Sequence, residues 1–124
     1  MSPDEFSALA MDLGPGIQVR AILDTTLYRI GGKAFATLGW PASGWAVVKV
    51  SPARQAWALS LSDAAAPEPG RRRNAGIVLL RLATMEADAA AELLAEAWSF
   101  AHRAGLARGR AGAGGGQALV TSAL

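Results

Sequence analysis

The chain has 124 residues, a formal net charge of +2, 52% hydrophobic residues, no cysteine and one histidine. This length suits one small domain, and the hydrophobic share is large enough to form a core, which excludes wholesale disorder. The lack of cysteine excludes disulfides, thiolate metal sites and cysteine nucleophiles, and one histidine cannot build a multi-histidine metal site.

The sequence also bears on location. It contains no run of about 20 apolar residues of the kind that spans a membrane. It begins with the acidic pair Asp4 and Glu5, whereas a secretory signal begins with basic residues and an apolar run. We therefore expect a cytoplasmic protein that does not engage a membrane.

The first predicted element is a helix. Ser2 and Glu5 have the spacing of a capping box, with Ser2 as the N-cap residue and Glu5 at the third helical position. Apolar residues then recur at helical spacing and form one stripe: Phe6, Leu9, Ala10 and Leu13. Gly14 is placed for a left-handed cap, and Pro15 prevents the helix from continuing.

Three antiparallel strands are predicted next. Residues 17–21 alternate apolar and polar, which indicates a strand that ends before a turn at Asp24. Gly31 and Gly32 separate two further strand segments, and two glycines accept the positive φ angles of a type I′ hairpin turn. In that register Ile30 faces Lys33 and Tyr28 faces Phe35. Residues 45–50 form the next strand, after a turn over residues 40–44.

The middle of the chain predicts a short helix and a buried strand. Ser51 and Pro52 read as the N-cap and first residue of a helix, whose buried stripe would be Ala53, Ala56, Trp57 and Leu61. A loop over residues 62–74 carries the run Arg71, Arg72 and Arg73. Residues 75–83 are almost all apolar, which favours a central strand covered on both faces.

The last predicted helix begins with Thr84 as its cap and ends at Gly105. Its inward stripe would be Ala90, Leu93, Leu94, Ala97, Trp98 and Ala101. Residues 1–104 then form one domain, and the glycine- and alanine-rich residues 105–124 form a flexible tail. The element order predicts a two-layer α+β fold, a mostly antiparallel sheet with helices packed on one face.

Charge is unevenly distributed along the chain. Residues 1–16 and 84–104 each carry a net charge of −3, whereas residues 17–83 carry +6. We expect acidic outer helices and a basic sheet with basic loops, an asymmetry that can steer a polyanion toward the sheet. The alternative is that these charges are merely solvated or pair with one another within the monomer.

The segment Tyr28–Leu38 (YRIGGKAFATL) resembles the hairpin of the MmcQ/YjbR family. The similarity continues in Val48–Pro52 and in the leucines and aromatics of residues 93–101, and it covers about residues 6–104. It implies a compact α+β domain with frataxin-like topology, described for the family as a double-wing DNA-binding domain. Gly31 and Gly32 would form the tip of one wing, and the loop over residues 70–76 would be the second contact region. Many members carry a tryptophan and an aromatic residue or threonine around that loop, where this chain has GRRRNAG, so it gains charge and loses a stacking group.

These observations favour a small DNA-binding protein that contacts the phosphates of duplex DNA. The predicted contact residues are basic and lie in the hairpin, the following strand and the loop: Arg29, Lys33, Lys49, Arg71, Arg72 and Arg73. No residue pattern indicates base readout, so binding would be weak and salt-sensitive. The alternative is a non-enzymatic interaction or homodimerisation module in which Trp40 and Trp45 contact a partner.

Catalysis and cofactor binding have no support in the sequence. His102 has no serine or aspartate placed to complete a catalytic constellation. Glu92 and Glu96 share a helix face but offer too few oxygen ligands for a hard cation, so a solvated face is expected. Trp57 and Trp98 lie at helical core spacing and are predicted to be structural. We therefore expect a protein without enzymatic activity, cofactor or metal, present as a monomer or weak homodimer.

Overall fold

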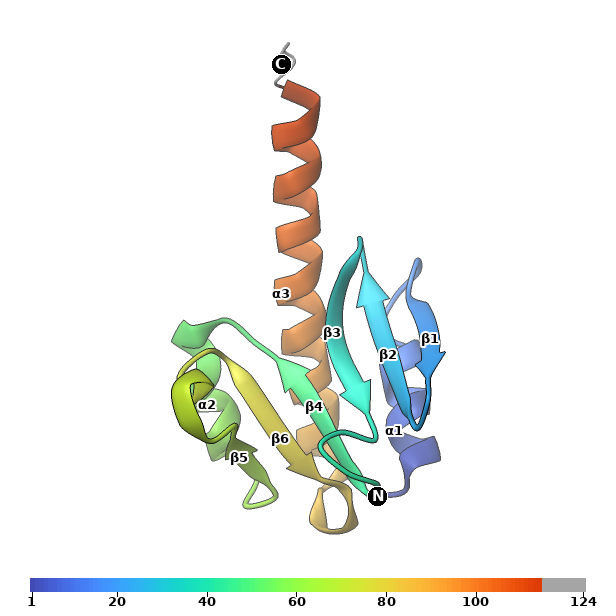
Figure 1. Cartoon of the computed structure of the whole chain (residues 1–124), viewed down its shortest axis with the longest axis vertical. Helices are drawn as coiled ribbons and strands as arrows, with labels where there is room; N and C mark the ends of the chain where they lie inside the picture. The colour runs from blue at the N-terminus through green and yellow to red at the C-terminus, as the bar shows by residue number, and fades with distance from the viewer. Residues whose placement is uncertain (115–124) are drawn as a thin grey trace.

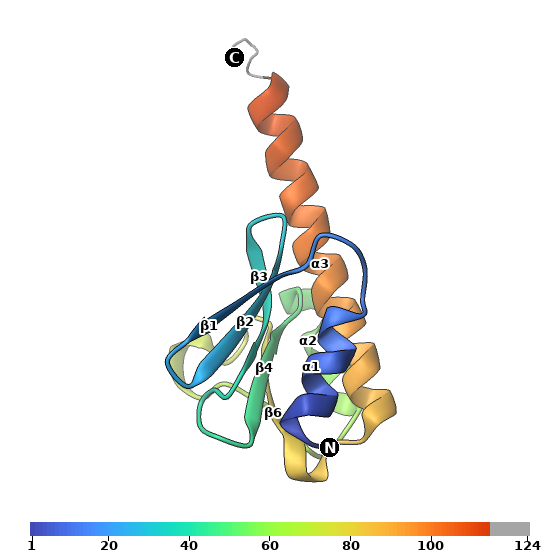
Figure 2. The same ribbon diagram turned by 90° about the vertical axis from the view of Figure 1, so that its right-hand side faces the viewer.

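The computed structural model describes the backbone of residues 1–114 and the side chains of residues 1–107. Six antiparallel strands form one sheet in the order β1-β2-β3-β4-β6-β5. The three helices lie together on one face of this sheet, as the two views show (Figures 1 and 2). The predicted two-layer α+β fold is thereby confirmed.

The strands are β1 (Gln18–Ile22), β2 (Thr25–Ile30), β3 (Lys33–Leu38), β4 (Trp45–Lys49), β5 (Ala65–Pro67) and β6 (Ile77–Arg81). The helices are α1 (Pro3–Met11), α2 (Gln55–Ser60) and α3 (Ala87–Gly114), and single 3₁₀ turns are η1 (Pro52–Arg54), η2 (Gly70–Arg72) and η3 (Leu82–Thr84). The outermost strands of the sheet are the exposed β1 on one side and the three-residue β5 on the other.

The capping box at the start of α1 is confirmed. The backbone N–H of Glu5 donates to the hydroxyl of Ser2 at 3.1 Å, and the N–H of Ser2 donates to the carboxylate of Glu5 at 2.7 Å. The helix ends at Met11, and the expected left-handed cap at Gly14 is wrong because Gly14 has no positive φ. A Cβ at Gly14 would lie 3.1 Å from Cζ2 of Trp98, so this glycine makes room for an indole ring.

The glycine hairpin forms as predicted at its tip. Gly31 and Gly32 have φ angles of 57° and 81°, and Ile30 pairs with Lys33. The expected pairing of Tyr28 with Phe35 is wrong, because a bulge in β3 adds one residue and Tyr28 pairs with Ala36. The rings of Tyr28 and Phe35 still pack at 6.3 Å between centroids, on the helix side of the sheet.

The second helix buries a different set of residues from the predicted stripe. The turn η1 precedes α2, and its tighter winding rotates the following residues about the axis. Gln55 and Ala58 are therefore the buried residues, and Ala53 and Ala56 face solvent. The strand β5 interrupts the segment predicted as a loop, and it pairs with the predicted buried strand, which is β6.

Helix α3 begins at Ala87, because Thr84 belongs to the turn η3. Its predicted inward stripe is buried except for the half-buried Trp98. The helix does not end at Gly105 but continues to Gly114, and its last turns extend past the sheet (Figure 1). A Cβ at Gly105 would lie 3.4 Å from the carbonyl oxygen of Gly31, which is an ordinary van der Waals distance, so the helix passes close to the hairpin tip at this residue. Residues 115–124 of the predicted tail lie outside the described residues.

The core fills the space between the helices and the sheet. Its largest fully buried side chains include Phe6 from α1, Tyr28 from β2 and Leu93 from α3. The rings of Phe6 and Tyr28 meet edge to face at 6.4 Å. The hydroxyl of Tyr28 donates a 2.8 Å hydrogen bond to the hydroxyl of Ser7, which ties the sheet to α1. Packing on this one face leaves the opposite face of the sheet without helices.

Candidate nucleic-acid interface

We call the face of the sheet that carries no helix the open face (Figure 2). The strand register places a continuous row of side chains across its middle: Leu27, Thr37, Val47 and Leu79. Ile77 and Leu79 are only 5% and 9% exposed, although neither belongs to the core beneath the helices. Neighbouring side chains on the open face therefore cover them, and this face has an apolar centre of its own.

Basic side chains surround this apolar centre. The register assigns four of them to outward positions of the strands: Arg20, Arg29, Lys49 and Arg81. Among the outward positions of the six strands, all of which the structure describes, none is acidic. Acidic residues lie on the helices of the opposite layer: Asp4, Glu5, Asp88, Glu92 and Glu96. Within residues 1–104, the charged residues of α1 and α3 are thus mainly acidic, with Arg103 as the basic exception, whereas the outward strand positions are basic.

The six basic residues expected to contact DNA do not all reach the open face. Arg29 and Lys49 occupy outward positions of β2 and β4. Lys33 pairs with Ile30, which is buried on the helix side, so the register assigns Lys33 to that side. The arginine run divides, with Arg72 on the open face and Arg73 away from it.

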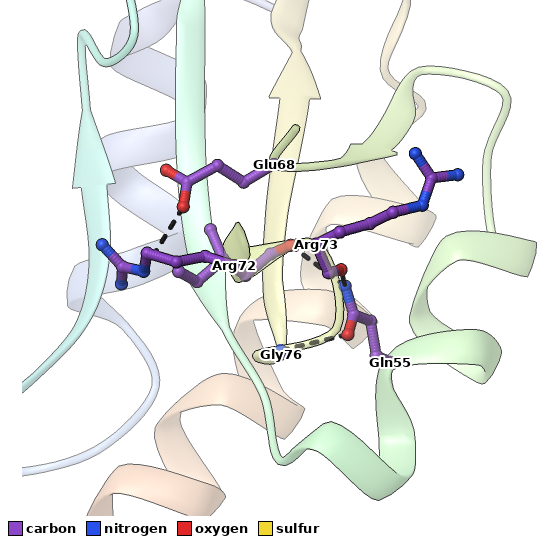
Figure 3. Close-up of polar contacts among 6 residues, drawn as sticks. Gln55, Glu68, Arg72, Arg73 and Gly76 are labelled. Carbon is purple, nitrogen blue, oxygen red and sulfur yellow. Dashed lines mark hydrogen bonds and ion pairs between the residues drawn. The ribbon is translucent and has the colours of Figure 1, made fainter. Parts of the chain in front are cut away.

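Figure 3 shows this division at the arginine loop. Nε of Arg72 lies 3.5 Å from a carboxylate oxygen of Glu68, and the guanidinium reaches on across β4 toward β3. The side chain of Arg73 points in the opposite direction, and it lines a separate hollow beside α2. Arg71 is exposed within η2. Three adjacent arginines in sequence are therefore not one cluster in space.

A buried amide holds this loop in place. Nε2 of Gln55 donates to the carbonyl oxygen of Arg73 at 2.7 Å, and Oε1 of Gln55 accepts from the N–H of Gly76 at 3.0 Å (Figure 3). Gly76 has a φ of 87°, and a Cβ there would lie 2.1 Å from the carbonyl oxygen of Val50. The loop can follow this path only with glycine at that position, and the path sets where Arg72 lies.

A hollow of about 200 Å³ opens on this face between Arg72 and β3. It is lined by Thr37, Val47 and Ile77 and by two exposed basic residues, Lys49 and Arg72. Trp40 lines the hollow as well. The site therefore combines two cations, the carboxylate of Glu68 that pairs with one of them, apolar residues and one aromatic residue.

The two tryptophans named as partner-binding candidates have different surroundings. Trp40 is 52% exposed. Trp45 is half-buried, and the guanidinium of Arg81 lies over its ring at 4.6 Å from the centroid. Trp40 also borders a larger hollow of about 800 Å³ at the end of the sheet, next to the exposed side chains of Ile22 and Leu23.

Sequence reasoning did not select four of these residues. Arg20 and Arg81 lie in segments predicted as strands, and the alternation of side chains along a strand is the signal that could place them beside Arg29 and Lys49 on one face. Ile22 follows the alternating segment 17–21, and Leu23 has a positive φ of 54° at the turn and is 98% exposed. No pattern in the sequence predicts that conformation for leucine.

The other polar groups lie away from the open face. The ring of His102 stacks on that of Trp98 at 4.8 Å on α3. Glu96 pairs with Arg54 at 3.7 Å, and the guanidinium of Arg54 lies over the ring of Trp57. Within residues 1–107, no group of three histidine, aspartate or glutamate side chains could hold a metal ion.

Comparison with known proteins identifies no family for this chain, so the functional assignment depends on its own residues. The chain matches no family model, no curated protein and no solved structure. The MmcQ/YjbR resemblance therefore stays a prediction. In the part of the chain that the structure describes, none of the helices has the length and apolarity needed to cross a membrane.

Proposed function

We propose that the protein binds DNA weakly and without sequence preference through the open face of its sheet. The observation that supports this best is the charge of that face, which carries Arg20, Arg29, Lys49 and Arg81 at outward strand positions that include no acidic residue. Arg72 extends the basic surface from the adjoining loop, and the paired Glu68 offsets part of its charge.

Phosphate contacts are the mode of binding that these side chains favour. Lysine and arginine that neutralise phosphates release condensed counterions, which makes affinity fall steeply as salt rises. Reading bases in a duplex requires a helix or a ribbon inserted into a groove. The helices of this protein lie on the other face of the sheet, and the tip of the β2–β3 hairpin at Gly31 lies against Gly105 of α3. Contacts from a sheet surface to the DNA backbone carry no sequence information.

The arginine loop provides a matched test of this surface. The variant Lys49→Ala/Arg72→Ala removes one lysine and one arginine from the open face, and Lys33→Ala/Arg73→Ala removes the same types elsewhere. Both variants are titrated against labelled duplex DNA of mixed sequence by fluorescence anisotropy at low salt. The open-face variant should bind more weakly and lose about 2 from the slope of log K against log salt, at about 0.9 per phosphate contact.

The control variant should keep the wild-type affinity and slope. Equal losses in the two variants would show that only net charge matters and would reject the open face as the site. No binding by the wild-type protein at low salt would reject the function itself.

A second candidate function is a non-enzymatic interaction module. It is supported by three apolar side chains around the larger hollow, Ile22, Leu23 and Trp40, which are 41%, 98% and 52% exposed. Exposed apolar side chains that gather in one place are typical of protein contact sites. Size-exclusion chromatography with light scattering over a range of concentrations tests whether a homodimer forms. Leu23→Ser should abolish such a dimer while leaving DNA binding unchanged.

A further inference from the structure

We infer that the open face prefers single-stranded nucleic acid over duplex DNA, with one base seated in the hollow between Trp40 and Arg72. This inference rests on the proposed function, because it uses the same cations for the phosphates. It adds the class of nucleic acid and the residue that selects it.

The shape and lining of the hollow support a base as its occupant. Its volume of about 200 Å³ is below the ~300–1,000 Å³ typical of sites for drug-sized molecules, which leaves space for a single planar ring. Val47 and Ile77 provide an apolar floor, and Ile77 is 5% exposed. A base offers a flat apolar surface of matching chemistry, and in a duplex that surface is stacked against its neighbours.

The cations stand where the phosphates of such a strand would lie. Lys49 is exposed at the rim, next to Arg72. Arg72 uses Nε for its ion pair with Glu68, so the two terminal nitrogens of its guanidinium point away from Glu68 (Figure 3). The ion pair therefore fixes the direction of the side chain and leaves the outer edge of the guanidinium turned toward the hollow and solvent.

Trp40 supplies the stacking surface. This residue is 52% exposed and lines the same hollow as the two cations. Base stacking on an aromatic ring combined with backbone contacts from basic residues is the usual means by which sheet surfaces bind single strands. A paired base cannot reach this ring without leaving its duplex. The preference for single strands is therefore predicted to depend on the ring of Trp40, whereas binding to duplex DNA depends only on the cations.

The test compares labelled oligothymidine of roughly a dozen nucleotides, a length within the ~4–16 nucleotides that small single-strand-binding domains cover, with a duplex of equal length. Oligouridine of the same length is a third probe. Wild type should bind both single strands at least about five-fold more tightly than the duplex, the factor that corresponds to the weaker end of base–aromatic stacking. Trp40→Leu should lose this preference and keep duplex binding, whereas Trp40→Phe should retain most of the preference.

Folding and binding can be separated in this design. Trp40→Phe and Trp40→Leu should both keep the wild-type circular dichroism spectrum, and intrinsic fluorescence should fall on addition of oligothymidine in wild type but not in Trp40→Phe. Duplex binding as tight as that of the single strands, or an unchanged preference in a folded Trp40→Leu, would overturn this inference and leave the proposed function standing. Absence of binding to all three probes would overturn both.

Discussion

Nε2 of Gln55 donates a 2.7 Å hydrogen bond to the carbonyl oxygen of Arg73, and this bond joins α2 to the arginine loop. The same side chain accepts from the N–H of Gly76, and it is only 6% exposed. A buried amide that satisfies both a donor and an acceptor of the backbone fixes the loop as firmly as a regular element would. The direction of Arg72 therefore depends on a residue that does not touch it.

Replacing Gln55 by alanine should lower the free energy of unfolding by about 1–3 kcal/mol, because the N–H of Gly76 would be left buried without its partner. Gln18→Ala removes the same side chain from the exposed edge strand β1 and should change stability by less than about 0.5 kcal/mol. Urea denaturation of both variants measures the difference. Similar losses in the two would mean that the loop does not rely on this amide.

Alanine substitutions at Gly76 and Gly70 provide a second matched comparison. Both have positive φ, 87° and 91°, so alanine at either position carries the backbone strain of about 1–2 kcal/mol. At Gly76 the new Cβ would also meet the carbonyl oxygen of Val50 at 2.1 Å, whereas at Gly70 the described residues leave 4 Å clear. Gly76→Ala should therefore lose more than about 3 kcal/mol or fail to fold, and Gly70→Ala should fold. Thermal unfolding compares the two, and equal melting temperatures would contradict the close approach to Val50.

Acid should destabilise the protein through two glutamates at the starts of helices. Hydrogen bonds from the backbone and hydroxyl of Ser2 hold the pKa of Glu5 below its ordinary value of 4.5, and a hydrogen bond from Ser62 does the same for the pKa of Glu86. A carboxyl group whose pKa is lowered by folding stabilises the protein above that ordinary value, and this contribution is lost as pH falls through the lower folded pKa. The free energy of unfolding should thus decline as pH falls below 4.5.

Chemical denaturation at a series of pH values from neutral to acidic tests this dependence. Glu5→Gln and Glu86→Gln should each flatten the decline, since a glutamine cannot be protonated in this range. Ser62→Ala should also flatten it, because it removes the donor to Glu86. An acid dependence identical to wild type in all three variants would assign the decline to other groups.

The salt dependence of DNA binding should report how many of the open-face cations take part. Full engagement of Arg20, Arg29, Lys49, Arg72 and Arg81 predicts a slope of log K against log salt of about −4.5 for duplex DNA and about −3.5 for a single strand, from ~0.9 and ~0.7 per phosphate. Arg81→Ala should reduce the duplex slope by about 1. A wild-type slope near −1 would mean that the face does not act as a unit.

The two-layer fold could be predicted from the sequence because the local signals for its elements agree with one another. The Ser2 capping box, the Gly31–Gly32 turn and the apolar stripe of α3 each specify one element by a short-range rule. Errors occurred where a long-range contact decides the structure. The helix α3 continues through Gly105, where it passes the hairpin tip at Gly31, and no local pattern contains that contact.

The candidate site was harder to predict for the same reason. Arg71, Arg72 and Arg73 look equivalent as a run, and only the folded loop sends Arg72 and Arg73 in opposite directions. Conversely, Arg20 and Arg81 are far apart in sequence and share a face because four strand pairings connect β1 to β6 across the sheet. Clusters of charge that depend on strand order cannot be seen before that order is known.

The two edge strands of the sheet differ in how well they can pair with a strand of another molecule. Pro67 and a length of three residues leave β5 little to offer a neighbouring strand, whereas β1 presents five exposed residues without a proline. Growth of a fibre by strand addition requires that every subunit has two edge strands able to pair with a neighbour. A molecule with one such edge can pair with a single neighbour, so strand addition through β1 would stop at a pair of molecules.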